Sequence, residues 1–123
     1  MENCLHSDLT YKIIGCAMEV HKELGAGFLE KVYENALMLA FKEEGILAET
    51  QKPLKVKFHG IIVGDYCADI IVEDKILLEI KAVKAIVPEH RAQIINYLTA
   101  TGIKVGLLIN FGSKSLEHER FIK

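Results

Sequence analysis

Apolar residues recur at helical spacing over the first third of the chain. The pattern over residues 7–24 predicts an amphipathic helix that begins at Ser7 or Asp8, either of which is a good N-cap. The stretch 28–45 repeats the pattern and ends at Gly45, as the C-terminus of a helix commonly does. We therefore expect two consecutive helices, each with one apolar face.

From residue 46 onward the apolar period changes from about 3.6 to about 2. Residues 54–59 alternate between apolar and polar side chains, which is typical of a half-buried strand. Two further apolar segments follow, separated by a short turn at residues 73–75. Pro88 then begins a predicted helix that Gly102 ends, and a nearly all-apolar strand follows it.

The predicted order is therefore α-α-β-β-β-α-β. A helix between two strands indicates a crossover connection, and hence a mixed sheet with helices packed against it. The chain has 123 residues and shows no linker, repeat or low-complexity segment. We expect one α/β domain that spans residues 1–123.

Composition narrows the functional classes only a little. Half of the residues are hydrophobic, yet the longest apolar runs are far too short to span a bilayer. No basic stretch precedes a long apolar one at the N-terminus, so the expected location is the cytosol. The net charge of −2 is not typical of a nucleic-acid-binding domain, although an enzyme can concentrate basic residues around an acidic site. Three widely spaced cysteines without a CxxC pair do not indicate a zinc site.

Charged residues interrupt the two strands on either side of the predicted turn. With a three-residue turn centred on Asp74, Asp69 stands opposite Glu79. Lys81 lies two residues after Glu79 and so points to the same face. A two-residue turn would instead place Asp69 and Glu79 on opposite faces. The prediction of a common site depends on this register.

Two carboxylates about 5 Å apart would repel each other by roughly 3 kcal/mol at an effective dielectric constant of about 20. A proton, a basic neighbour or a divalent cation would offset this repulsion. Oxygen ligands with room for water suit Mg²⁺ or Mn²⁺, and Lys81 could orient an attacking water beside them. The alternative is a salt bridge among Asp69, Glu79 and Lys81 on a solvated face of the sheet. The pattern alone is compatible with both.

Polar residues on the predicted helices supply further candidates. Glu30 and Tyr33 follow Gly27 at three-residue intervals and border an apolar stripe, so Glu30 could project toward the sheet. The alternative is an ordinary first-turn glutamate favoured by the helix dipole. On the later helix, Gln93 and Tyr97 share a face and could hydrogen-bond a phosphate or a base. The alternative there is a polar helix edge with a core tyrosine.

Basic residues on either side of these candidates could contact phosphates. Lys52, Lys55 and Lys57 lie on one side, and Lys84 and Arg91 on the other. A solvated strand face and helix end is the alternative interpretation.

Taken together, these motifs resemble the GxxExxY proteins, a branch of the PD-(D/E)xK nuclease superfamily. The resemblance extends from about residue 11 to residue 111. It is carried by the segments GFLEKVY, DYCADIIVE, LLEIKAV, HRAQIINYL and GLLINFG, in matching order. One departure is Ala68, since part of the superfamily has a proline before the corresponding aspartate.

The resemblance implies a restriction-endonuclease-like core, with Asp69 and Glu79 as ligands of Mg²⁺ or Mn²⁺. Lys81 would assist the attacking water, and Glu30 would be the upstream acidic residue that many members supply from a helix. The implied function is metal-dependent hydrolysis of phosphodiester bonds in nucleic acid. The alternative is a non-catalytic nucleic-acid-binding or regulatory module that retains the nuclease fold.

The same resemblance extends to substrate binding. Gln93 and Tyr97 are similar to the QxxxY element of nucleases that process DNA ends, which implies DNA as substrate and is compatible with exonuclease-like action. Together with Tyr33, they form the set expected to contact the substrate. A chain of this size has no room for a separate targeting domain, so specificity would come from a partner or a homo-oligomer, or be absent.

Overall fold

The structure is a computed structural model that describes residues 5–123. The first four residues, on which the expectation of a cytosolic location partly depends, lie outside it. The described elements, in chain order, are the helices and strands α1 (Ser7–Leu24), α2 (Glu30–Glu43), β1 (Ala48–Phe58), β2 (Ile61–Val72), β3 (Ile76–Lys81), α3 (Pro88–Thr101), β4 (Val105–Asn110) and β5 (Glu117–Ile122).

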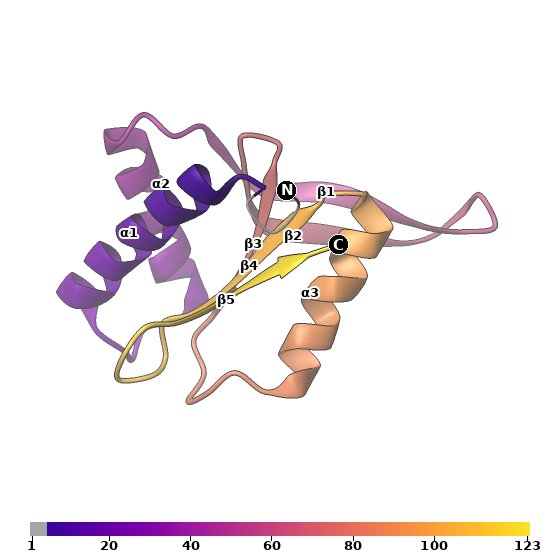
Figure 1. Ribbon diagram of the computed structural model, residues 1–123. Helices are drawn as coiled ribbons and strands as arrows, with labels where there is room; N and C mark the ends of the chain where they lie inside the picture. The colour runs from indigo at the N-terminus through magenta and orange to yellow at the C-terminus, as the bar shows by residue number, and fades with distance from the viewer. Residues whose placement is uncertain (1–4) are drawn as a thin grey trace.

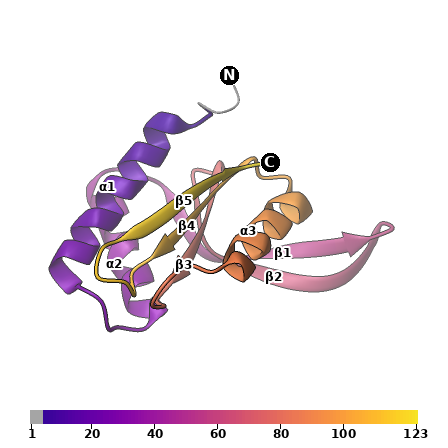
Figure 2. The same ribbon diagram turned by 60° about the horizontal axis from the view of Figure 1, so that its bottom comes forward.

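The strands form one five-stranded sheet in the order β1-β2-β3-β4-β5. β3 and β4 are parallel, because α3 crosses between them, and the other neighbouring strands are antiparallel. Helices α1 and α2 pack on one face of the sheet and α3 packs on the other (Figures 1 and 2). The predicted α/β architecture with a mixed, helix-flanked sheet is therefore confirmed.

The last strand, β5, extends the predicted order. It carries charged residues on both of its faces, including Glu117, Glu119 and Arg120, so its sequence has no apolar alternation. It lies at the edge of the sheet, where charged side chains oppose pairing with other chains. An apolar pattern could not reveal a strand of this kind.

The helix ends agree closely with the sequence signals. Pro88 begins α3, and Gly102 ends it with a left-handed φ of 76°. α1 begins slightly earlier than expected, because His6 is its N-cap and Ser7 is already helical. Among the residues that the structure describes, no helix has both the length and the apolar character needed to cross a membrane.

The side chains of the sheet contribute to two separate cores. The larger core lies under α1 and α2, and its fully buried members include Ile13, Tyr33, Leu37, Phe41, Ile70, Ile76, Leu78 and Ile109. The smaller core lies under α3 and consists of Ala68, Ile71, Leu77, Ile94, Leu98 and Leu108. Successive residues of a strand point to opposite faces, so Glu79 and Lys81 follow Leu77 on the α3 face.

Candidate active site

The register between β2 and β3 is the one on which the predicted site depends. Ile70 lies opposite Leu78, and the pairing continues without a shift to the turn at residues 73–75. Two residues of this turn have positive φ angles, which close a three-residue connection. The β2–β3 ladder ends at this pair, and continuing the same register by one residue would place Asp69 opposite Glu79.

Asp69 lies where the alternation of β2 is interrupted. Gln51, which lies across from it on β1, has a positive φ of 51°. Ala68 and Ile71 both pack under α3, although residues three apart on a regular strand point to opposite faces. The Asp69 side chain turns toward β3, and its Oδ2 accepts the backbone N–H of Ile80 at 2.8 Å. The irregularity thus brings this carboxylate to β3 just past Ile70 and Leu78, the last pair of the β2–β3 ladder.

The ionisation of Asp69 reflects both burial and several charged neighbours. Burial raises the pKa of this carboxyl, and the N–H of Ile80 opposes that effect. Glu34 and Glu30 raise the pKa further, whereas the ammonium of Lys81 lowers it. The N-terminal half of α2 therefore places two acidic side chains close enough to Asp69 to act on its charge.

Glu79 is almost fully buried, with 6% of its surface exposed. Burial raises its pKa to about 7, although Lys81 and the backbone N–H of Asp69 lower it. Its Oε1 atom is buried and accepts no hydrogen bond from the described residues. Leaving a buried carboxylate oxygen without a donor costs about 1–3 kcal/mol or more. A proton or a bound cation would supply the missing partner.

Lys81 connects the strand to α3. Its Nζ donates to Oε1 of Gln93 at 3.2 Å. Burial and the charges of Glu79 and Asp69 raise the pKa of Tyr97, and a hydrogen bond from Gln93 partly offsets this. The structure thus brings together five of the predicted residues, the two carboxylates, the lysine and the Gln93–Tyr97 pair.

Tyr97 is held in place by a residue that sequence reasoning missed. Its ring stacks on that of Tyr66 from β2, with centroids 3.4 Å apart and planes 19° from parallel. The Tyr66 hydroxyl is buried and has no hydrogen-bond partner among the described residues. A tyrosine within an alternating strand is an ordinary feature, so nothing in the sequence indicated this role.

Glu34 is the second residue that the sequence did not single out. The GxxExxY motif points to Glu30, which is exposed in the first turn of α2, whereas Glu34 is buried one turn later. Its carboxylate accepts hydrogen bonds from Nε2 of Gln51 at 3.1 and 3.4 Å and pairs with Lys31 at 3.7 Å. Of the two glutamates, Glu34 has the larger effect on the pKa of Asp69. A glutamate next to the apolar stripe of α2 was the available signal.

The loop between Lys81 and α3 is fixed by Asn110 at the end of β4. Asn110 is fully buried; its Oδ1 accepts the N–H of Val83 at 2.9 Å, and its Nδ2 donates to the Val83 carbonyl at 2.9 Å. Nδ2 also donates to Oε1 of Glu117 at 2.8 Å. A Cβ at Gly112 would stand 2.3 Å from the Val83 backbone, so only glycine fits there. Asn110 is the one polar residue of an otherwise apolar strand, and this was the sequence signal for its role in fixing the loop.

Tyr33 is not among the residues brought together. Its side chain is fully buried in the larger core, where its ring stacks on that of Phe111 with centroids 4.6 Å apart. Its hydroxyl donates to the carbonyl of Gly25 at 2.6 Å and accepts the N–H of Phe28 at 3.2 Å. This placement assigns Tyr33 to the α1–α2 connection rather than to the expected contact with substrate.

The expected phosphate-binding residues are partly engaged in ion pairs on the surface. The pairs are Lys52 with Asp74 at 3.1 Å, Lys55 with Asp65 at 2.6 Å and Arg91 with Glu119 at 2.8 Å. Exposed pairs of this kind are typically worth about 0–1 kcal/mol, so a phosphate group can compete with the carboxylate.

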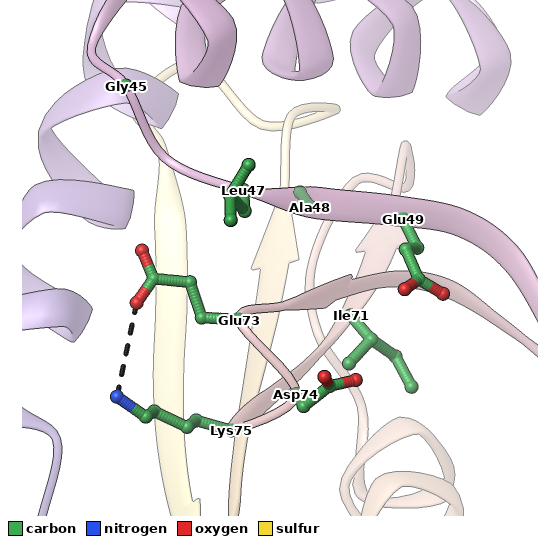
Figure 3. A pocket seen from close by; sticks show the side chains of 8 residues that line it. All are labelled: Gly45, Leu47, Ala48, Glu49, Ile71, Glu73, Asp74 and Lys75. Atoms are coloured by element: carbon green, nitrogen blue, oxygen red, sulfur yellow. Dashed lines mark ion pairs between the residues drawn. The ribbon is translucent and has the colours of Figure 1, made fainter.

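A hollow of about 500 Å³ lies beside the β2–β3 turn, and Figure 3 shows its lining. The residues that line it are Gly45, Leu47, Ala48, Glu49, Ile71, Glu73, Asp74 and Lys75, none of which is a predicted site residue. The turn precedes β3 and Lys81 ends it, so the hollow and the candidate site lie at opposite ends of the strand.

The donor atoms of the candidate site suit a hard divalent cation. No cluster of three or more His, Cys, Asp or Glu side chains that could hold a metal ion occurs within residues 5–123. The predicted metal ligands include only two side chains, Asp69 and Glu79, and a backbone carbonyl and water would complete the coordination. Oε1 of Glu79 has no partner and the Asp69 carboxylate commits only one oxygen to Ile80, so each has an oxygen of the kind that Mg²⁺ or Mn²⁺ prefers as a ligand.

Two comparisons with known proteins bear on the family and the fold of the chain. The family model described as PD-(D/E)XK nuclease superfamily matches residues 7–121. A solved structure titled "Crystal structure of SSO0001" superimposes with a TM-score of 0.58 at 19% sequence identity. The match covers 76% of this chain and 49% of that one, so the chain spans about half its length, and at this identity the likeness shows the fold alone. No curated protein matches.

Proposed function

Because this chain belongs to the PD-(D/E)XK nuclease superfamily, we propose that it is a metal-dependent nuclease that hydrolyses phosphodiester bonds of nucleic acid. Within the superfamily we assign it to the GxxExxY branch, on the motif at residues 27–33. The observation that carries the proposal is the environment of Glu79, a buried carboxylate with an unpartnered oxygen beside Asp69 and Lys81.

Asp69 and Glu79 are the residues that would hold Mg²⁺ or Mn²⁺. A bound divalent ion would supply Lewis acidity, lowering the pKa of a water and stabilising charge on a phosphoryl oxygen. The protein's own contribution is to bury the Glu79 carboxyl and to direct Asp69 against β3 through the N–H of Ile80. Burial raises the pKa of Glu79 to about 7, so near neutral pH a cation held by this carboxyl would compete with a proton.

Lys81 provides the positive charge that phosphodiester hydrolysis needs. Its ammonium is close enough to both carboxylates to lower their pKa values, and the 3.2 Å hydrogen bond to Gln93 restricts its position. A fixed ammonium can orient the attacking water or stabilise the negative charge that develops on the phosphate. Glu30, at the start of α2, is the proposed upstream acidic residue, and the buried Glu34 also raises the pKa of Asp69.

We propose DNA as the substrate, with exonuclease-like action, on the similarity of Gln93 and Tyr97 to the QxxxY element. A tyrosine hydroxyl is protonated near neutral pH, and the pKa of Tyr97 is raised further, so this hydroxyl can donate a hydrogen bond to a phosphate oxygen. Gln93 contacts both Lys81 and Tyr97, and so couples the position of the catalytic lysine to that of the substrate-binding tyrosine.

The test is cleavage of labelled linear DNA and RNA by the purified chain with Mg²⁺ or Mn²⁺. We expect metal-dependent cleavage that Glu79→Gln and Lys81→Ala each lower by about a hundredfold or more, since each removes an electrostatic element of the site. Glu73→Gln, an exposed glutamate of the same hairpin, is the matched control and should cleave at the wild-type rate.

Equal rates in the wild type and in Lys81→Ala would trace the cleavage to a contaminant and contradict the proposal. Absence of cleavage with either metal, together with a metal-dependent rise in melting temperature, would favour the non-catalytic binding module instead.

A further inference from the structure

β1 and β2 extend beyond the rest of the sheet as a two-stranded arm, residues 53–66 (Figures 1 and 2). The arm turns at His59 and Gly60, whose φ angles of 51° and 77° are those of a tight hairpin turn. Neither the core under α1 and α2 nor the core under α3 includes a residue of the tip, residues 58–63.

The tip nevertheless carries large apolar side chains. Their exposed fractions are 62% for Phe58, 67% for Ile61, 55% for Ile62 and 62% for Val63. The His59 ring stacks on that of Phe58, with centroids 4.0 Å apart. Scattered exposed apolar residues are normal, but a contiguous group at the end of a projecting hairpin indicates an interaction surface.

The arm is basic although the chain as a whole carries a net charge of −2. Its strands contain Lys55 and Lys57 against a single carboxylate, Asp65. Lys55 pairs with Asp65 at 2.6 Å, but both side chains are more than half exposed, so the pair is weak and open to competition by a phosphate. A partner that offers apolar faces and negative charge together fits this surface.

A groove of about 650 Å³ lies between the base of the arm and α3. Its lining consists of Leu54, Lys55, Lys57, Asn96, Thr99, Ala100 and Thr101. Asn96 is adjacent to Tyr97 and about one helical turn from Gln93, so α3 contributes to both the groove and the candidate active site.

We propose that the arm binds unpaired nucleotides of the same nucleic-acid strand that is cut at Glu79 and Lys81. The inference rests on the proposed function. The flat faces of bases are accessible only where nucleotides are unpaired, and they stack on aromatic side chains whatever the sequence. A duplex presents its phosphates and base edges instead, which the apolar tip does not match.

The length of the arm sets the length of strand that this binding requires. Asp69 lies eight positions after Ile61 on β2, which corresponds to about 26 Å at about 3.3 Å per residue. A bound strand therefore extends from the carboxylates, past Tyr97 and along the groove, to Phe58 at the tip. Short oligonucleotides that occupy the active site do not reach the tip.

The test is fluorescence anisotropy of labelled single-stranded oligonucleotides of about 4 to 16 nucleotides, in a metal chelator, with the full chain carrying Glu79→Gln, so that metal-dependent cleavage does not interfere. We expect affinity to rise with length until the strand spans the site and the tip. Adding Phe58→Ser and Ile62→Ser should weaken binding of the long oligonucleotides about tenfold or more and abolish the dependence on length. Both residues are exposed, so the fold tolerates the changes.

Tyr11→Ser in the same background is the matched control. Tyr11 is 82% exposed and belongs to α1, a helix on the far side of the molecule from the tip (Figure 1), so its substitution should leave every affinity unchanged. Lys57→Ala should weaken binding of all long oligonucleotides. It should also lower the slope of the logarithm of affinity against the logarithm of salt concentration by about 1, as expected for the loss of one phosphate contact.

Three results would overturn the inference. The first is unchanged affinity for long single strands in the Phe58→Ser, Ile62→Ser chain. The second is an equal loss of affinity for a blunt duplex, which would show that unpaired bases are not recognised. The third is light scattering that shows a dimer converted to a monomer, with affinity per chain unchanged, which would assign the tip to a second copy of the chain. Because binding is measured without cleavage, absence of nuclease activity would be a separate result.

Discussion

The two faces of the sheet are built from the same strands but differ in what they bury. On the face toward α1 and α2, β3 presents Ile76, Leu78 and Ile80, all of them buried in the larger core. On the face toward α3, the same strand presents Leu77 and then the charged residues Glu79 and Lys81. Since the larger core buries more apolar side chains, we expect the face toward α1 and α2 to contribute most of the stability, which would offset the cost of burying charges on the other face.

α3 covers its face only in part. It buries Ile94 and Leu98 against the sheet, whereas its N-terminal half places Gln93 beside Lys81. The smaller core therefore ends where the candidate site begins. Because its side chains alternate, β3 contributes apolar residues to the larger core on one face and charged residues to the candidate site on the other. We therefore expect substitutions at neighbouring residues of this strand to change the free energy of unfolding in opposite directions.

The largest expected effect is on the apolar face. Leu78→Ala should lower the free energy of unfolding by about 2–5 kcal/mol, because the fully buried side chain leaves a cavity between the sheet and the helices. Urea denaturation measures the change. Leu47→Ala, at a leucine that is 77% exposed, should stay within about 0.5 kcal/mol of the wild type. Equal effects at the two leucines would mean that the larger core is not packed as described.

The neighbouring position on the other face should show the opposite sign. Burial raises the pKa of Glu79 from its ordinary value of 4.5 to about 7, so in this pH window the folded chain binds more protons than the unfolded chain. The stability of the metal-free protein therefore falls as the pH rises through the window, by at most about 3 kcal/mol. Glu79→Gln cannot lose a proton, and so should be the more stable protein at about pH 8.

Urea denaturation in a chelator, at about pH 4.5 and about pH 8, tests this sign. The advantage of Glu79→Gln should be present at the higher pH and absent at the lower one. Glu73→Gln, at an exposed glutamate, should follow the wild type at both. Parallel pH profiles for the wild type and Glu79→Gln would show that Glu79 is not held in an unfavourable environment.

The smallest effect concerns a residue that the sequence motif placed with the substrate and the structure places in the larger core. Tyr33→Phe removes the hydrogen bonds to Gly25 and Phe28 and should lower the free energy of unfolding by about 1–2 kcal/mol. Affinity of the folded protein for oligonucleotides should not change. A loss of affinity without a loss of stability would show that Tyr33 contributes to substrate binding. It would contradict the assignment of this residue to the larger core alone.

The sequence predicted the elements well because their signals are local. Helical spacing and glycines indicated α1 and α2, Pro88 and Gly102 bounded α3, and the turn at residues 73–75 set the register of the hairpin. Strand β5 has no apolar period and owes its conformation to pairing with β4, a contact that no local pattern records.

The candidate site was predictable only in part. Asp69, Glu79 and Lys81 followed from alternation and register. The interruption at Asp69 did not follow, since it depends on the backbone of Gln51 on another strand. Roles for Glu34, Tyr66 and Asn110 depend on burial and on partners distant in sequence, which a single sequence does not specify.

A crystal structure of the chain soaked in Mn²⁺ tests the central claim most directly, because anomalous scattering locates the ion independently of activity. The account predicts one strong peak about 2.0–2.2 Å from oxygens of both Asp69 and Glu79, with Lys81 still directed toward Gln93. A peak held by other acidic residues, such as those beside the β2–β3 turn, or no peak with the Asp69 and Glu79 carboxylates pointing apart, would contradict it.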